Sequence, residues 1–194
     1  MGSGLATQLA KKNDVRIGSR NPEKARAAAA KIPGVEGEGN EAAARWCEVA
    51  IISVPFDAIA SLEGFADALA GKLVVSMINP LRREGNVLQY ASGGRSAAEL
   101  VAAALPRSSV ATAFNNIPAG FFSRPSEQEA DVLVAADTKE TYDKAASLVR
   151  SIPRLRPLYV GPLSQAESVE RITVMVLNAA ILNGGKRFAV KFVS

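Results

Sequence analysis

The feature that most constrains the fold is an alternation, along the whole chain, of short apolar or β-branched runs with longer alanine-rich runs. The short runs predict strands and the alanine-rich runs predict helices. Strands are expected near residues 14–18, 49–54, 72–77, 109–113, 131–136 and 158–160. Strands that alternate with helices favour an α/β fold, in which a doubly wound, mostly parallel sheet is covered by helices on its faces.

Two segments say more about their place in this fold. Residues 49–54 are almost uninterruptedly apolar before Pro55, which is typical of a strand covered on both faces, so we expect this strand in the sheet interior. Near the end of the chain, residues 164–183 place Val169, Ile172 and Val176 at helical spacing. This last helix either caps the sheet or mediates self-association.

The chain opens with a glycine-containing turn, Gly2-Ser3-Gly4, and no strand precedes it. Such a turn is weak evidence alone and could equally be the remnant of an expression tag. A helix at residues 5–12 and a strand at 14–18 follow, however, which is the order found in a nucleotide-binding β-α-β unit. We therefore expect the three residues to end a phosphate-binding loop of a Rossmann-type fold whose first strand lies outside this sequence. Without that strand, two neighbouring strands would have unpaired edges, which predicts poor stability.

The residues after the second strand of such a unit select between NAD and NADP. The chain has Ser19 and Arg20 there, with Lys24 one helical turn further on, and no carboxylate at positions 19 or 20. Asn21-Pro22-Glu23 is a typical helix start, and basic residues are disfavoured at the positive end of a helix dipole. Arg20 and Lys24 could be solvated surface charges, but their position favours an anion between them. The sequence therefore predicts NADP(H) binding by Ser19, Arg20 and Lys24.

Two further candidate positions follow strands, at the sheet edge where ligands bind in open α/β folds. Val54 and Pro55 end one strand, and Asn79 follows the next. Each could contact the cofactor or be part of an ordinary turn.

A third candidate is the loop after residues 109–113, which contains Asn115 and the apolar tripeptide Ile117-Pro118-Ala119. An apolar tripeptide can support a flat ring while a neighbouring amide bonds to the edge of the ring. In the alternative interpretation the loop is structural and its amides bond to backbone groups.

Composition restricts the class of protein. Lys and Arg number 23 against 19 Asp and Glu, without a basic block, which argues against a nucleic-acid partner. No apolar run approaches the length that a membrane span needs, and the single cysteine, Cys47, cannot form an internal disulfide. We expect a cytoplasmic protein without a metal site.

With these residues in place, the chain resembles the NADPH-dependent F420 reductases, also called F420H2:NADP oxidoreductases. The resemblance is carried by six short motifs in the same order. They are Gly-x-Gly-Leu-Ala at 2–6, Gly-Ser-Arg with the lysine at 18–24, Val-Pro at 54–55, Arg-Ser-Ala-Ala-Glu at 95–99, Ile-Pro-Ala at 117–119 and Gly-Pro-Leu-Ser at 161–164.

The resemblance implies roles for these residues. Ser19, Arg20 and Lys24 would hold the 2′-phosphate of NADP, and Val54 and Pro55 would line its site. Ile117, Pro118 and Ala119 would support the deazaflavin coenzyme F420. Residues 1–113 would form the NADP-binding domain, and residues 114–194 would carry the F420 loop and a small C-terminal helical lobe. The family is commonly dimeric, so a homodimer is expected.

The activity implied is hydride transfer between NADP(H) and F420. Such a transfer needs two stacked rings near contact, and most of the chemistry resides in the cofactors. The chain has no histidine, which argues against an imidazole acid–base mechanism, and we expect no catalytic residue in the strict sense. The alternatives are a reductase of the same fold that uses flavin or another acceptor, and a non-catalytic NADPH-binding protein.

Overall fold

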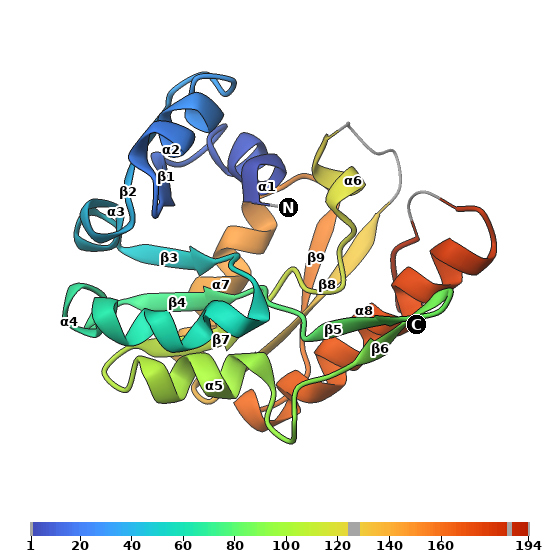
Figure 1. Cartoon of the computed structure of the whole chain (residues 1–194). Coiled ribbons are helices and arrows are strands. Elements are labelled where there is room, and N and C mark those ends of the chain that lie inside the picture. The colour runs from blue at the N-terminus through green and yellow to red at the C-terminus, as the bar shows by residue number, and fades with distance from the viewer. Residues whose placement is uncertain (1, 124–128, 186–187, 194) are drawn as a thin grey trace.

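The computed structural model describes residues 2–123, 129–185 and 188–193, and it is built round a five-stranded sheet (Figure 1). Its strands, in spatial order, are β3 (Val49–Ile52), β4 (Leu73–Ser76), β7 (Ser109–Thr112), β8 (Ala130–Ala136) and β9 (Leu155–Tyr159). Neighbours run parallel except β7 and β8, which are antiparallel. The predicted mostly parallel α/β sheet is confirmed, and all six expected strands are present with shifted ends.

Three strands were not predicted. The first is β2 (Val35–Gly39), which pairs in parallel with the predicted strand β1 (Val15–Ser19). The other two are β5 (Leu81–Glu84) and β6 (Val87–Tyr90), which form an antiparallel hairpin. The sequence of β2 is poor in strand-forming residues, but Gly37 lets helix α2 (Pro22–Ala29) approach it closely. A Cβ at Gly37 would lie 2.3 Å from the carbonyl carbon of Ala25, so this contact requires glycine.

The position of β3 differs from the prediction. Within the described residues β3 pairs only with β4, so it ends the five-stranded sheet instead of lying in its interior, and β1 pairs only with β2. Both strands thus have one edge without a strand partner in this part of the chain; two unpaired edges were expected, but the sequence analysis did not identify β3 as one of the two strands. The apolar run of β3 reflects its faces, because Val49 and Ile51 pack against one hydrophobic cluster and Ala50 and Ile52 against another. Apolar residues on both faces of a strand therefore do not indicate whether the strand pairs with one other strand or with two.

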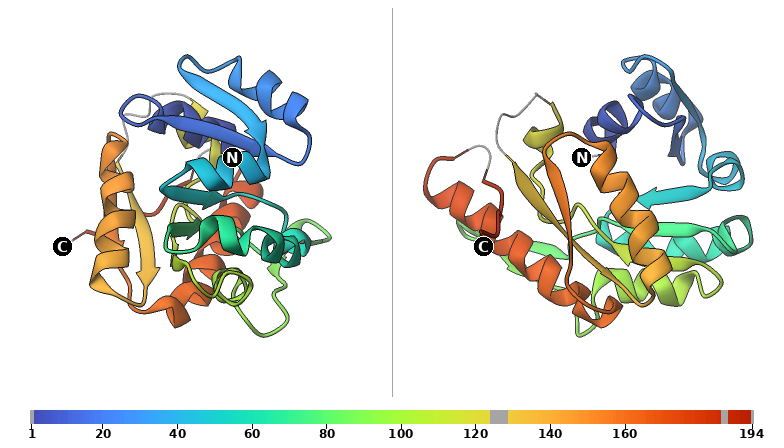
Figure 2. Two further views of the ribbon diagram at one scale, coloured as in Figure 1. Left: turned by 90° about the vertical axis from the view of Figure 1, so that its left-hand side faces the viewer. Right: turned by 180° about the vertical axis from the view of Figure 1, so that it is seen from behind.

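Helices cover both faces of the main sheet (Figure 2). The helix α7 (Lys139–Ser151) lies on one side. The 3-10 helix η1 (Phe56–Phe65), α4 (Ala66–Leu69) and α5 (Ala97–Ala104) lie on the other. The remaining helical elements are α1 (Gly2–Leu9), α3 (Asn40–Trp46), α6 (Ala119–Ser123), η2 (Leu163–Gln165) and α8 (Ala166–Leu182).

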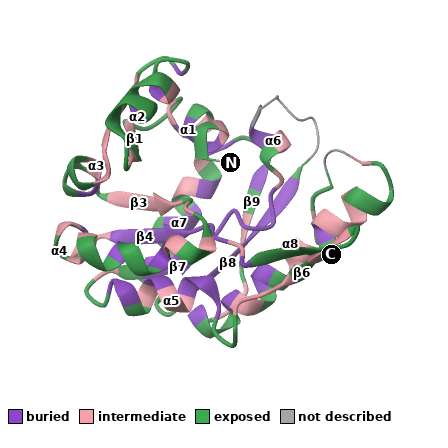
Figure 3. Cartoon of the chain, in the orientation of Figure 1, coloured by how far each residue is buried: buried purple, intermediate pink, exposed green. Residues whose placement is uncertain are grey.

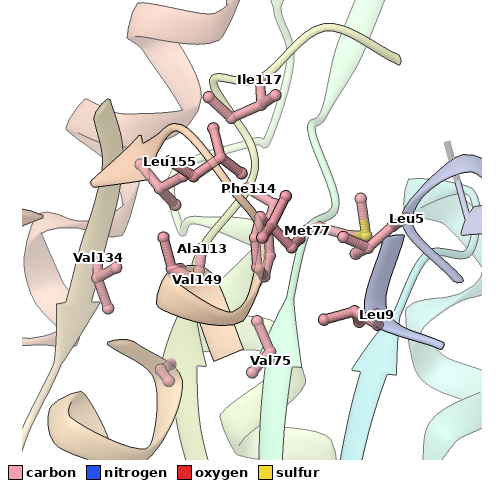
Figure 4. Close-up of a cluster of buried hydrophobic side chains, with 14 of the residues drawn as sticks. Leu5, Leu9, Val75, Met77, Ala113, Phe114, Ile117, Val134, Val149 and Leu155 are labelled. Atoms are coloured by element: carbon pink, nitrogen blue, oxygen red, sulfur yellow. The ribbon is translucent and has the colours of Figure 1, made fainter. Parts of the chain in front are cut away.

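Two hydrophobic clusters fill the spaces between these layers. The first joins α1, α6 and α7 to one face of the sheet and includes Leu5, Phe114 and Val149 (Figure 4). The second lies on the opposite face under η1 and α5 and includes Leu62 and Val101. Burial is greatest in β4, β7 and β8, whereas α2 is largely exposed (Figure 3).

The helix start expected at Asn21 is confirmed, and the motif at residues 95–99 is also a helix start. The Asn21 side chain accepts hydrogen bonds from the backbone N–H groups of Glu23 and Lys24 at the start of α2. Ser96 and Glu99 form a capping box at the start of α5. Among the helices described, none is long and apolar enough to cross a membrane.

Candidate functional site

The first turn of α1 lies at the carboxyl end of β3. We expected Gly2, Ser3 and Gly4 to end a loop before the helix. The helix instead begins at Gly2, so these three residues form its first turn. A Cβ at Gly2 would lie 3.7 Å from the Ser53 hydroxyl, which directly follows β3. Backbone N–H groups in a first helical turn have no acceptor within the helix, so this end of α1 offers donors to an anion.

The same turn also contacts α6. A Cβ at Gly4 would lie only 3.1 Å from the Cβ of Phe122 and 3.8 Å from the carbonyl oxygen of Ala119. The Gln8 side chain donates a hydrogen bond of 2.8 Å to the carbonyl oxygen of Phe122. Helix α1 therefore bridges the end of β3 and the segment that begins at Ala119.

Two exposed cations lie at the junction of β1 and α2. Arg20 and Lys24 are exposed, and neither has an ion pair among the described residues. Arg26, further along α2, does have an ion pair, with its Nη1 3.8 Å from Glu23 Oε1. Unpaired cations at the positive end of a helix favour an anionic ligand there.

The helix cap limits how such a ligand can be held. Asn21 Oδ1 already accepts from the N–H groups of Glu23, at 2.9 Å, and Lys24, at 3.3 Å. The Ser19 hydroxyl accepts from the Asn21 N–H at 3.2 Å and still has its own proton to donate. An anion at this position would therefore depend on the side chains of Ser19, Arg20 and Lys24.

The residues after β3 are only partly accessible. Pro55 is exposed, whereas Val54 is half-buried and packs against the second hydrophobic cluster. Pro55 is therefore accessible to a ligand at the end of β3, and Val54 is its neighbour in the chain.

The amide of Asn115 is buried and bonded within the protein. Asn115 is 2% exposed, and its Nδ2 donates to the carbonyl oxygen of Ile78 at 3.0 Å and to Asn79 Oδ1 at 3.3 Å. Its Oδ1 accepts from the Thr112 hydroxyl at 2.7 Å. This geometry fits the alternative in which the amide supports the loop, whereas Asn79 is partly exposed beside it.

The three residues of the apolar tripeptide that follows differ in their exposure to solvent. Ile117 is 1% exposed and belongs to the first hydrophobic cluster, Pro118 is half-buried and Ala119 is exposed (Figure 4). Phe114, just before the loop, has a φ of 65°, which is rare for an aromatic residue and turns the chain sharply at the end of β7. Pro118 and Ala119 are thus the accessible part of the predicted support for a ring.

The structure therefore gathers most of the predicted residues at one edge of the main sheet. The ends of β3, β4 and β7 lie side by side there, since Met77 N donates to Ile52 O and Ala113 N donates to Ser76 O. The start of α1 touches both the end of β3 and α6. The group Ser19, Arg20 and Lys24 lies outside this sheet, at the end of β1 and the start of α2, and β1 belongs to the separate β1–β2 sheet.

Sequence reasoning missed Thr112 beside this edge, and it included Asn116 among the loop amides without giving it a role of its own. Thr112 fixes the Asn115 amide, and Asn116 bonds to β8. The only sequence signal is that two adjacent amides follow a strand, and nothing in the sequence indicates their partners.

Buried ionisable groups lie away from the predicted residues. Glu170 is fully buried on α8 and accepts hydrogen bonds from Tyr90 and from the N–H groups of Ala97 and Ala98. Burial raises the pKa of the Glu170 carboxyl above its ordinary value, and burial likewise raises the pKa of Tyr90. No group of acidic, cysteine or histidine side chains within the described ranges could hold a metal ion.

Residues 1–80 match the family model of coenzyme F420-dependent NADP oxidoreductases. The F420-dependent NADP reductase of Methanothermobacter marburgensis is 35% identical over 198 residues, covering 94% of this chain and 88% of that protein. The rat metalloreductase STEAP3 is 32% identical over 184 residues, covering 91% of this chain and 36% of that protein. A solved structure from Arthrobacter sp. FB24, assigned as an F420-dependent NADP reductase, shares the fold with a TM-score of 0.87 at 20% identity, covering 100% of this chain and 94% of that one.

Proposed function

Since the chain belongs to the family of coenzyme F420-dependent NADP oxidoreductases, we propose that it transfers a hydride between NADP(H) and F420. The single observation that carries this proposal is the likeness to the reductase of M. marburgensis over nearly the whole of both chains. The two cofactors supply the hydride chemistry, and the chain's residues bind and orient them.

The structure supports a division of this binding between two groups of residues. Ser19, Arg20 and Lys24 hold the 2′-phosphate of NADP through side chains, because the nearby N–H groups are occupied by the Asn21 cap. The first turn of α1, with Gly2, Ser3 and Gly4, offers backbone donors to the pyrophosphate. The exposed Pro55, with Val54, borders the site at the end of β3.

The second ring lies against the loop after β7. Pro118 and Ala119 offer an accessible apolar surface, and Ile117 supports it from within the first hydrophobic cluster. Asn79 is partly exposed and can bond to a ring edge, whereas Asn115 holds Asn79 and the loop in place. On this proposal, residues 1–113 bind NADP(H) and residues 114–194 supply the F420 loop, although strands of both parts share one sheet.

We propose a homodimer formed through α8. This helix exposes Met175, Ile181 and Leu182 at 63%, 39% and 59%. Apolar side chains exposed along one helix are typical of a surface that another chain covers. Substitution of Met175 and Leu182 by Lys, followed by light scattering, tests this: the expected result is a monomer.

The test of the activity is a stopped-flow mixture of the protein with NADPH and oxidised F420. The expected result is loss of the deazaflavin absorbance band together with oxidation of NADPH. Absence of any change at that band would refute the proposed function.

The likeness to a metalloreductase supports a second candidate, an NADPH-dependent reductase with a different acceptor. FMN offered in place of F420 in the same assay distinguishes the two. Faster turnover with FMN would favour the second candidate, and tight NADPH binding without turnover on either acceptor would favour a non-catalytic protein.

A further inference from the structure

We propose that Asn116 is a positioning residue that fixes the Ile117–Ala119 loop against β8 and thereby sets the affinity for F420. This inference rests on the proposed function, because the loop is taken to be the support for the deazaflavin. Asn116 itself is 1% exposed and does not face a ligand.

Strand β8 extends beyond the end of its neighbour β7. The last paired residues are Thr112 and Ala135, so the edge of β8 before Ala135 has no partner from β7. The amide of Asn116 takes that place. Its Nδ2 donates to the carbonyl oxygen of Asp131 at 2.6 Å, and its Oδ1 accepts from the N–H of Leu133 at 3.2 Å. One side chain thus supplies the donor and the acceptor that a continuing strand would supply.

The attachment point on β8 is itself held firmly. The Asp131 carboxylate is 1% exposed and bonds to Arg156 at 2.7 and 2.9 Å. The N–H of Asp131 donates to the carbonyl oxygen of Val190 at 2.9 Å. Asn116 is therefore anchored to a strand that is fixed from both sides.

Asn115 and Asn116 together hold the start of the loop between two strands. Asn115 bonds to Ile78 just after β4, and Asn116 bonds to β8. The positive φ of Phe114 directs the chain from β7 into this position. Because Ile117 is the next residue along the chain, a displacement of the Asn116 amide passes directly into the segment proposed to support F420.

The substitution Asn116→Asp tests the role with almost no change of shape. Assayed at a pH high enough to ionise the introduced carboxyl, whose pKa burial raises, the side chain still accepts from Leu133 N–H but places an acceptor against the Asp131 carbonyl oxygen, where the amide donated. Loss of a buried hydrogen bond, together with repulsion between the two acceptors, changes a binding constant by about tenfold or more. We expect the KM for F420 to rise about tenfold, with the dissociation constant for NADPH changed by less than about twofold.

The chain offers a matched control. Asn178 on α8 also bonds a strand at two points, although both belong to one residue of β6: it accepts from Leu88 N–H at 2.7 Å and donates to Leu88 O at 2.8 Å. Asn178 is only half-buried, so Asn178→Asp should lower stability by less, and it should leave the KM for F420 unchanged. An unchanged KM for F420 in Asn116→Asp, an equal weakening of NADPH binding, or the same effect from Asn178→Asp would overturn the proposal.

A second measurement needs no substitution. Saturating F420 should slow hydrogen exchange of the Leu133 N–H several-fold and leave the Leu88 N–H unaffected, because only Leu133 is tied to the loop. Equal exchange at Leu133 with and without F420 would overturn the proposal. Absence of turnover by the unsubstituted protein would instead refute the proposed function and, with it, this inference.

Discussion

Reversing the charge of Arg20 should change which dinucleotide the protein uses. Arg20 is exposed and without an ion pair among the described residues, so its substitution breaks no contact that the fold needs. Backbone donors cannot replace it, because the Asn21 cap occupies the N–H groups of Glu23 and Lys24. The effect of Arg20→Glu should therefore fall on the ligand.

The expected magnitude follows from the lost and added interactions. A hydrogen bond to a charged group is worth about 1.5–3 kcal/mol. A carboxylate near the 2′-phosphate adds a repulsion of about 1 kcal/mol per pair of unit charges at 4 Å in water. Together they predict that kcat/KM for NADPH falls about 100- to 1000-fold, whereas kcat/KM for NADH, which lacks that phosphate, stays within about threefold.

The assay is steady-state F420 reduction with each dinucleotide at fixed ionic strength. Arg26→Glu is the matched control, because it makes the same change of charge nearby, on α2 just after Arg20, at a residue that already forms an ion pair with Glu23. If the NADPH to NADH ratio is unchanged in Arg20→Glu, or falls equally in Arg26→Glu, the assignment of the phosphate to this group is wrong.

Three predictions concern stability. Gly37→Ala forces a methyl group into the backbone of α2 and should lower the free energy of unfolding by about 1–3 kcal/mol in urea denaturation, whereas Gly64→Ala, with open space around it, should be neutral. Asp131→Asn should lower the free energy of unfolding by about 1.5–3 kcal/mol at pH 7 and increase proteolysis of residues 188–193. The hydrogen bond from Arg156 lowers the pKa of Asp131 in the folded protein. The stabilisation by Asp131 is therefore present above pH 3.8 and is lost as the pH falls through this lowered pKa. Burial raises the pKa of Glu170, so its stabilising contribution is complete below pH 4.5 and is lost as the pH rises through the folded value; Glu170→Gln should remove that slope in urea titrations across pH 4–8, and an unchanged slope would contradict the assignment.

The family and the binding of NADP(H) could be predicted from short motifs, because the residues proposed to select the phosphate are close together in the chain. Ser19, Arg20 and Lys24 are close in the chain, and a helix start between them constrains their geometry locally. Likewise the capping box at Ser96 and Glu99 needs only neighbouring residues.

Strand partners could not be read in this way. β2 depends on a close approach between Gly37 and the backbone of α2, and the hairpin β5–β6 is fastened by Asn178, 90 residues from Leu88 along the chain. The edge position of β3 was also missed, because apolar faces record packing by helices and not the number of paired strands.

The amides of the loop show the same division most clearly. Local composition identified an apolar tripeptide beside two asparagines and left open whether the amides meet a ligand or the backbone. Folding decided this, since Asn115 meets Ile78 and Asn116 meets Asp131 only when β4, β7 and β8 come together. Short-range geometry is encoded by neighbours in the chain, whereas the partner of a buried polar group is chosen by the packing of distant strands.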